Sequence, residues 1–131
     1  MGEFDVGQPI ARTEDPRLLT GGGSYSDDWK LSNLLYGYAL RSPHAHADIK
    51  SINRSKAEAM PGVQAVLTAE DYRAEGFGDL KCGSKWNPKQ YQPPNPPLAL
   101  ARVRYVGEAV AFIIADSINR AKDAAELVSV E

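Results

Sequence analysis

An uninterrupted apolar run at residues 110–115 constrains the fold of this chain more than any other feature. The run contains valine, isoleucine and phenylalanine and lacks polar alternation, which predicts a central strand covered on both faces. Asp116 or Ser117 follows at a position suited to cap a helix. Apolar residues then recur at helical spacing, namely Ile118, Ala121, Ala125 and Val128. The small alanines allow this predicted helix to lie close to the sheet.

Shorter elements are predicted before this run. Strands are expected at residues 34–40, 47–52, 63–67 and 102–105, and helical turns at residues 15–21, 55–60 and from residue 68. Asp15 is the expected N-cap of the first helical turn, and Thr68 with Asp71 has the spacing of a capping box. The sequence therefore predicts an α/β (α+β) fold, in which a mixed sheet carries short helices.

The character of the sequence changes near residue 33. Residues 1–33 are rich in turn formers, including three consecutive glycines, and predict an extended, irregular segment. Residues 34–131 are expected to form the folded domain. Residues 128–131 have the pattern of the first part of another strand. We therefore expect the chain to be a fragment of a longer protein, truncated at residue 131.

Composition excludes several classes of function. The chain has 131 residues, of which 43% are hydrophobic and 24% charged, as in a folded domain rather than a disordered one. Its net charge of −2 supplies no basic surface for nucleic acid. The longest apolar run is too short to cross a bilayer, and the amino terminus lacks the pattern of a secretory signal. A single cysteine, Cys82, excludes an internal disulfide, so we expect a cytoplasmic protein without membrane insertion.

Residues 76–97 contain five prolines and three glycines, which exclude a regular element. An irregular stretch of this length is usually functional or covers another surface. Trp86 and Tyr91 within it are therefore candidate interface residues. Glu108 is a third candidate, because it follows a glycine bend and precedes the apolar run. It can instead anchor that turn.

Both histidines of the chain, His44 and His46, lie in one short window. On a strand they would share a face, which suits two imidazoles bound to one metal. A zinc site needs three or four protein ligands, however, and there is no third histidine. The alternative is that these imidazoles form hydrogen bonds to the backbone or to an adjoining domain. The sequence favours this alternative and keeps His44 and His46 as metal candidates.

No other motif supports a reactive centre. The glycines at residues 21–23 lack the lysine of a phosphate-binding loop. The acidic pairs at residues 14–15 and 27–28 are typical of caps and solvated turns. Cys82 has no sequence neighbour that argues for an activated thiol beyond two lysines. We assign no catalytic and no cofactor-binding residue to this chain.

Several stretches, in order, resemble one protein family. These are residues 12–21, Tyr25, residues 27–28, 41–47, 60–63, 103–111 and 123–128. Together they are similar to the opening of the large, molybdenum-binding subunit of the xanthine dehydrogenase, aldehyde oxidase and carbon monoxide dehydrogenase family. The resemblance implies an amino-terminal α/β hammerhead domain. Gly22, Ser24 and Ala109 depart from the usual pattern and leave the subfamily open.

The resemblance also implies a larger enzyme. Members of this family bind a molybdopterin-type molybdenum cofactor and insert a water-derived oxygen into a C–H bond, or oxidise carbon monoxide. Electrons leave through [2Fe–2S] clusters to FAD in partner subunits. The cofactor contacts and the catalytic glutamate come from later domains, so this chain alone is expected to be inactive and to hold no cofactor. The alternative from another class is a free-standing, non-enzymatic binding module that uses His44 and His46.

Overall fold

The computed structural model describes residues 11–81, 91 and 93–131, and it divides the chain into two units, Met1–Ser32 and Asn33–Glu131. In the first unit, α1 (Asp15–Leu19) and the 3-10 helix η1 (Ser26–Asp28) contain no buried residue. The prediction of Asp15 as N-cap is wrong, because Glu14 holds that position without a side-chain cap. Asp15 is instead the first residue of the helix, and Pro16 is the second. The prediction had placed Pro16 at the first helical position.

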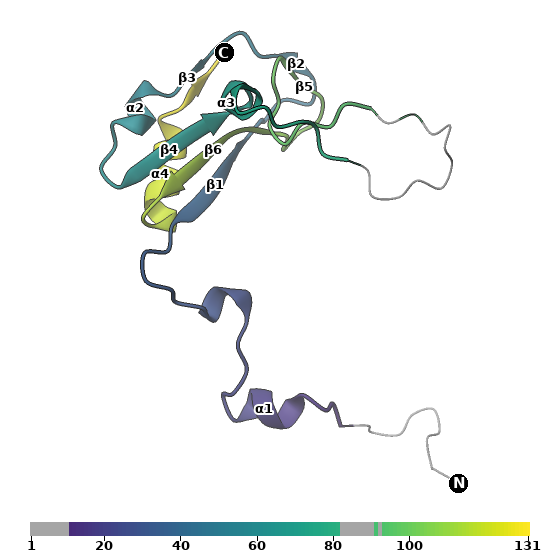
Figure 1. The fold of residues 1–131 in the computed structure, drawn as a ribbon, viewed down its shortest axis with the longest axis vertical. Coiled ribbons are helices and arrows are strands. Elements are labelled where there is room, and N and C mark those ends of the chain that lie inside the picture. The colour runs from purple at the N-terminus through teal and green to yellow at the C-terminus, as the bar shows by residue number, and fades with distance from the viewer. Residues whose placement is uncertain (1–10, 82–90, 92) are drawn as a thin grey trace. The chain divides into compact units, whose positions relative to one another are not determined.

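The second unit contains a three-stranded sheet with the order β1-β6-β4 (Figure 1). These strands are β1 (Tyr36–Arg41), β4 (Val63–Thr68) and β6 (Ala109–Ala115). The prediction that the apolar run forms the central strand is confirmed. The expected mixed sheet is antiparallel in every described pair, because β1 and β4 are separated by β6, which runs in the opposite direction.

Two short ladders flank this sheet. β2 (Ala47–Asp48) pairs with β5 (Arg102–Val103), and β3 (Ile52–Asn53) pairs with β7 (Ser129–Val130). The strand expected at residues 47–52 is thus split in two. The reason is a change of partner, since Ile49 N donates to Ala101 O at 2.9 Å while Lys50 N donates to Glu131 O at 2.7 Å. In an extended segment, the backbone N–H groups of successive residues point to opposite sides of the strand. Ile49 and Lys50 can therefore bond to different neighbouring segments.

In the second unit, the start and stop signals of the sequence match the observed helices. α2 (Ser55–Glu58) ends before Pro61 and Gly62, and α3 (Ala69–Ala74) begins at the predicted capping box of Thr68 and Asp71. α4 (Ile118–Glu126) has Ser117 as its N-cap, whose side chain accepts a hydrogen bond from the backbone of Arg120. The α+β class with short helices is therefore confirmed.

The core lies between α4 and one face of the sheet (Figure 1). Six of its nine buried residues are alanines, and Ile113 is its largest fully buried side chain. Alanines on α4 let the helix backbone approach the strands closely. The expectation that both faces of the central strand are covered is wrong for the described residues, because Phe112 on the opposite face is 37% exposed. The single long helix packs on one side of the sheet only.

The proline-rich stretch contributes no helix or strand among its described residues, which are 76–81, 91 and 93–97. Its other residues, including Cys82 and Trp86, lie outside the described part. Within the described chain, no helix has the length and apolar character needed to cross a membrane.

Candidate functional site

A tight turn at residues 105–108 places Glu108 immediately before the central strand. Glu108 N donates to Tyr105 O at 3.3 Å, and Gly107 adopts φ +90°. A positive φ at the third position of a turn is the conformation for which glycine is suited, since it has no Cβ to clash. The glycine bend read from the sequence is therefore a turn with a specific backbone requirement.

This turn is bonded to the end of β1. Gly107 N donates to Ser42 O at 2.8 Å, and Ser42 N donates to Glu108 O at 2.9 Å. The Arg41 guanidinium adds a bond of 2.8 Å to Gly107 O. Ser42 is buried, and so is Glu108, which is only 8% exposed and accepts a hydrogen bond from the backbone of Arg104 through its own carboxylate. The Glu108 side chain thus closes its own turn and has little surface to offer a partner.

The other interface candidates lie in the proline-rich stretch. Tyr91 is 80% exposed. Trp86 lies outside the described residues, so its surroundings are not part of the structure. Tyr91 is thus available at the surface, and the role of both aromatic residues in an interface remains a prediction.

His44 and His46 are both exposed and lie in the connection between β1 and β2. They do not lie on a strand, so the condition under which they would share a strand face is not met. The backbone of His44 is instead held by Ser42, whose Oγ accepts from His44 N at 3.0 Å. The structure thus shows a bent connection between the strands expected at residues 34–40 and 47–52.

A nearby carboxylate is already engaged. Asp48 pairs with Arg102, and this hydrogen bond and charge lower the pKa of Asp48 below its ordinary value of 3.8, with a smaller contribution from His46. Within the described residues, no group of three or more His, Cys, Asp or Glu side chains is placed to hold a metal ion. Asp48 is therefore not free to act as a third ligand beside His44 and His46, and no chemical step is assigned to these residues.

A cavity of about 330 Å³ lies beside this connection, where the two short ladders meet the end of β1. Arg41, His44, Asp48 and Glu131 contribute polar groups to its wall, and valines such as Val103 and Val110 contribute the apolar part. Of the polar groups, Arg41 is bonded to Gly107 and Asp48 to Arg102. The charged groups of the cavity thus serve the packing of neighbouring segments.

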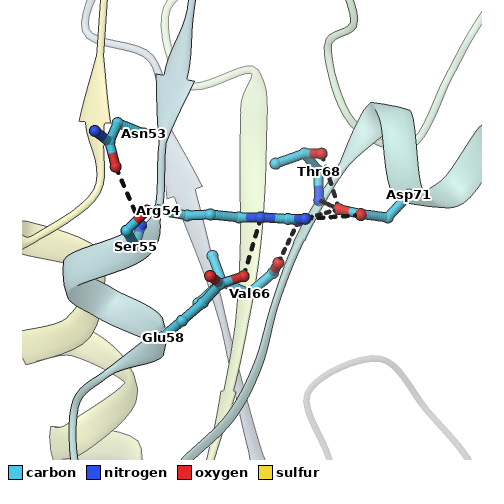
Figure 2. Close-up of polar contacts among 7 residues, drawn as sticks. All are labelled: Asn53, Arg54, Ser55, Glu58, Val66, Thr68 and Asp71. Carbon is cyan, nitrogen blue, oxygen red and sulfur yellow. Dashed lines mark hydrogen bonds and ion pairs between the residues drawn. The ribbon is translucent and has the colours of Figure 1, made fainter.

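A cluster of polar contacts among the described residues is centred on Arg54 (Figure 2). Its guanidinium donates to Val66 O at 2.7 Å and to Asp71 Oδ1 at 3.0 Å, and it forms a second contact with Asp71 Oδ2. Its Nε lies 3.0 Å from Glu58 Oε1. We call Arg54, Glu58, Val66 and Asp71 the Arg54 clamp. It connects the start of α2 with the edge strand β4 and with α3.

Asp71 has two roles in the clamp. Its Oδ2 accepts from Thr68 N at 2.7 Å and from Thr68 Oγ1 at 2.9 Å, which caps α3 (Figure 2). The hydrogen bond from Arg54 and those from Thr68 lower the pKa of Asp71 well below its ordinary value, although burial opposes this shift. A carboxylate that accepts several donors favours its charged form. The clamp is thus an ion pair at neutral pH that also holds the start of α3.

The clamp was not found from sequence. Asp71 carried a local signal, the capping box, but its partner Arg54 lies 17 residues away. No periodicity or spacing links the two positions, because their contact depends on the path of β4. Charge alone does not distinguish Arg54 from the chain's other basic residues.

The fold and these polar contacts define a small α+β domain whose charged residues fix turns and helix starts. Comparison with known proteins gives the family. The family model described as "Aldehyde oxidase and xanthine dehydrogenase, a/b hammerhead domain" matches residues 20–131. The chain belongs to this family, which confirms the resemblance seen in its motifs.

Known relatives are much longer than this chain. It is 39% identical over 137 residues to the nicotine 6-hydroxylase large subunit of Paenarthrobacter nicotinovorans, which matches 96% of the chain and 15% of that protein. It is 42% identical to the carbon monoxide dehydrogenase large chain of Afipia carboxidovorans, with 92% of the chain and 14% of that protein covered. The chain therefore spans about 15% of the length of these relatives.

Solved structures agree. The quinoline 2-oxidoreductase of Pseudomonas putida 86 superposes with a TM-score of 0.80 at 42% identity, over 93% of this chain and 15% of that one. A Cu,Mo-CO dehydrogenase gives a TM-score of 0.77 at 41% identity, over 95% of this chain and 15% of that one. The fold of this domain is thus the fold of the corresponding part of these proteins.

Proposed function

We propose that this chain is the leading structural domain of the large subunit of a molybdenum-dependent oxidoreductase, a hydroxylase or dehydrogenase. Residues 34–131 form the hammerhead domain, residues 1–33 form an extended segment before it, and the chain continues in the parent protein. The domain shapes the subunit around a cofactor that later domains hold. One observation carries the proposal: almost the whole chain matches the amino-terminal part, about 15%, of proteins named as molybdenum-binding subunits.

The chemistry of the parent protein follows from the family. A molybdopterin-type cofactor would be bound by later domains of the same chain, and FAD and iron–sulfur subunits would be the electron-transfer partners. The parent protein would work in the cytoplasm without membrane insertion. Five charged residues of the described chain, namely Asp48, Arg54, Asp71, Arg102 and Glu108, are bound to one another or to a turn, which supports a scaffold role. Fold alone does not determine a substrate, so none is assigned.

The test is a domain replacement. This chain replaces the matched amino-terminal part of the carbon monoxide dehydrogenase large chain of Afipia carboxidovorans, and the chimera is produced with that enzyme's other subunits. We expect a soluble complex that contains molybdenum and oxidises carbon monoxide. The same complex in which the matched part is simply deleted is the control and should not assemble.

The isolated chain provides the second measurement. Elemental analysis should find molybdenum and iron far below one atom per chain, and the chain should show no turnover alone. Stoichiometric molybdenum in the isolated chain, or catalysis by it without added subunits, would contradict the proposal.

A further inference from the structure

The face of the sheet that points away from α4 is apolar along its regularly paired stretch, and Arg41 lies at its end, beyond the register shift between Leu40 and Arg41. In antiparallel pairs, residues directly opposite one another point to the same side. The register therefore places six side-chain positions on this outer face, namely Gly37, Ala39, Ala65, Leu67, Phe112 and Ile114. None of the six is polar or charged. We call these six residues the open face.

The open face is accessible to solvent in this domain. Phe112 is 37% exposed and Leu67 is 38% exposed, and the other four residues are exposed or half-buried. The Phe112 ring lies over Gly37, where an added Cβ would come 2.3 Å from its Cζ. The missing side chain of Gly37 therefore leaves room for the tip of the aromatic ring.

A groove of about 500 Å³ continues from the open face toward α3. Tyr72, Phe77 and Leu98 form its apolar wall, and the rings of Tyr72 and Phe77 lie 5.3 Å apart. Phe77 is 61% exposed. The charged residues at this groove, such as Glu75 and Arg41, add few polar groups to a lining that is mostly hydrocarbon. The open face and the groove thus form one concave apolar surface.

Such a surface is unusual for a sheet that faces water. An antiparallel sheet with a solvated face alternates apolar residues with polar ones. Here, β6 places alanines and Ile113 toward the helix and places Phe112 and Ile114 outward. Contiguous exposed apolar surface of this kind marks an interaction site. The pattern indicates that the outer side is also covered when the protein is in its working state.

We propose that the open face and its groove are the surface on which the remaining polypeptide of the large subunit packs. This inference rests on the function proposed above and specifies which side of the domain makes the contact. Most of the length of the relatives lies outside this chain, so the parent protein has ample polypeptide to fill the groove. An interface with few charges is typical of permanent contacts rather than transient ones.

A second copy of this chain fits the surface less well. A symmetric dimer would place the same concave surface on both sides, so two grooves would face each other and leave space unfilled. Interfaces pack as densely as protein interiors, which requires a convex partner. A segment or domain of different shape from the same subunit meets that requirement.

The experiment uses cysteines at matched positions. Leu67 and Ile118 are both 38% exposed, but Leu67 lies on the open face and Ile118 lies on α4. Leu67→Cys and Ile118→Cys are each made in a background with Cys82→Ser, and Phe112→Cys provides a second reporter on the open face. The rate of maleimide labelling is measured in the isolated chain and in the carbon monoxide dehydrogenase chimera described above.

We expect Leu67→Cys and Ile118→Cys to react at similar rates in the isolated chain. In the assembled chimera, Leu67→Cys and Phe112→Cys should slow by about tenfold or more, while Ile118→Cys keeps its rate. Unchanged labelling of both open-face reporters in an assembled, molybdenum-containing chimera would overturn this inference and leave the proposed function intact. A chimera that fails to assemble would count against both.

The isolated chain tests the other occupants. Labelling of Leu67→Cys that slows as protein concentration rises would assign the surface to a second copy of the chain. Slow labelling at every concentration would assign it to a segment of this same chain. A further outcome concerns the chimera. If Ile118→Cys is protected there as strongly as Leu67→Cys, both sides of the domain are buried and the open face is not the specific contact. Each of these results contradicts the assignment of the open face to the rest of the subunit.

Discussion

The two faces of the three-stranded sheet share the same strands but differ in what covers them. On the inner face, Ile113 is fully buried beneath the alanines of α4. On the outer face, Phe112 and Ile114 remain at least partly exposed. Both faces are apolar. The described residues of the domain cover only one of the two faces, and we propose that the apolar character of the other reflects the environment of the complete protein.

The largest effect should distinguish these faces directly. Ile113→Ala removes a fully buried side chain and should lower the free energy of unfolding by about 3 kcal/mol. Ile114→Ala removes the same atoms from the half-buried outer face and should cost about 1 kcal/mol in the isolated chain. Urea denaturation of both variants measures the difference. Equal losses would show that the outer face is as well covered as the inner one.

The next effect concerns the clamp at the edge of the sheet. Asp71→Asn removes the charge that Arg54 and Thr68 bind, and should destabilise the chain by about 1–2 kcal/mol at neutral pH. Asp48→Asn is the matched control, because Asp48 also pairs with an arginine but its side chain is 65% exposed, against 32% for Asp71. We expect no measurable loss of stability for the control. A loss as large as that of Asp71→Asn would show that exposure does not weaken such pairs.

The clamp also predicts a dependence on pH. The pKa of Asp71 is lowered in the folded state, so its contribution is present above the ordinary value of 3.8 and is lost as the pH falls below it. The difference in unfolding free energy between the wild type and Asp71→Asn should therefore be constant from pH 7 to about 5 and shrink toward pH 3. Urea denaturation at several pH values measures it. A difference that grows on acidification would contradict this sign.

A smaller effect tests the packing of the outer face itself. Gly37→Ala places a Cβ against the Phe112 ring and should cost about 1 kcal/mol. In a Phe112→Leu background the contact is removed, so the same substitution should cost much less. A double-mutant cycle on unfolding free energies measures this coupling. If Gly37→Ala lowers the free energy of unfolding equally in both backgrounds, the cause is the backbone conformation at residue 37 and not contact with the Phe112 ring.

The sequence predicted the elements whose signals are local. The capping box of Thr68 and Asp71, the Ser117 cap and the central strand all depend on residues close in the chain, and the structure contains each of them. Contacts between distant residues were missed. Arg54 meets Asp71 only after β4 has been placed, and the ladder of residues 47–52 splits because its two halves pair with different partners.

The motifs of the family were likewise visible in the sequence, while their local geometry was not. Glu108 was expected either at an interface or in a turn, and its contacts are those of the turn. The covering of β6 was overestimated for a related reason. Apolar residues on two faces report that both become buried, but they do not say which polypeptide buries them.

The smallest effect is expected outside the sheet, in the connection that carries His44 and His46. Both imidazoles are exposed, the described residues supply no third ligand, and Asp48 is engaged with Arg102. Within the part of the chain that the structure describes, a zinc or nickel ion would therefore find at most two ligands, fewer than a protein site needs. Calorimetric titration of the isolated chain should detect no tight one-to-one complex, and His44→Ala should not change the result. A tight complex that is lost on replacing either histidine would instead support a metal-binding module, and would place a function on the side of the domain that neither face of the sheet predicts.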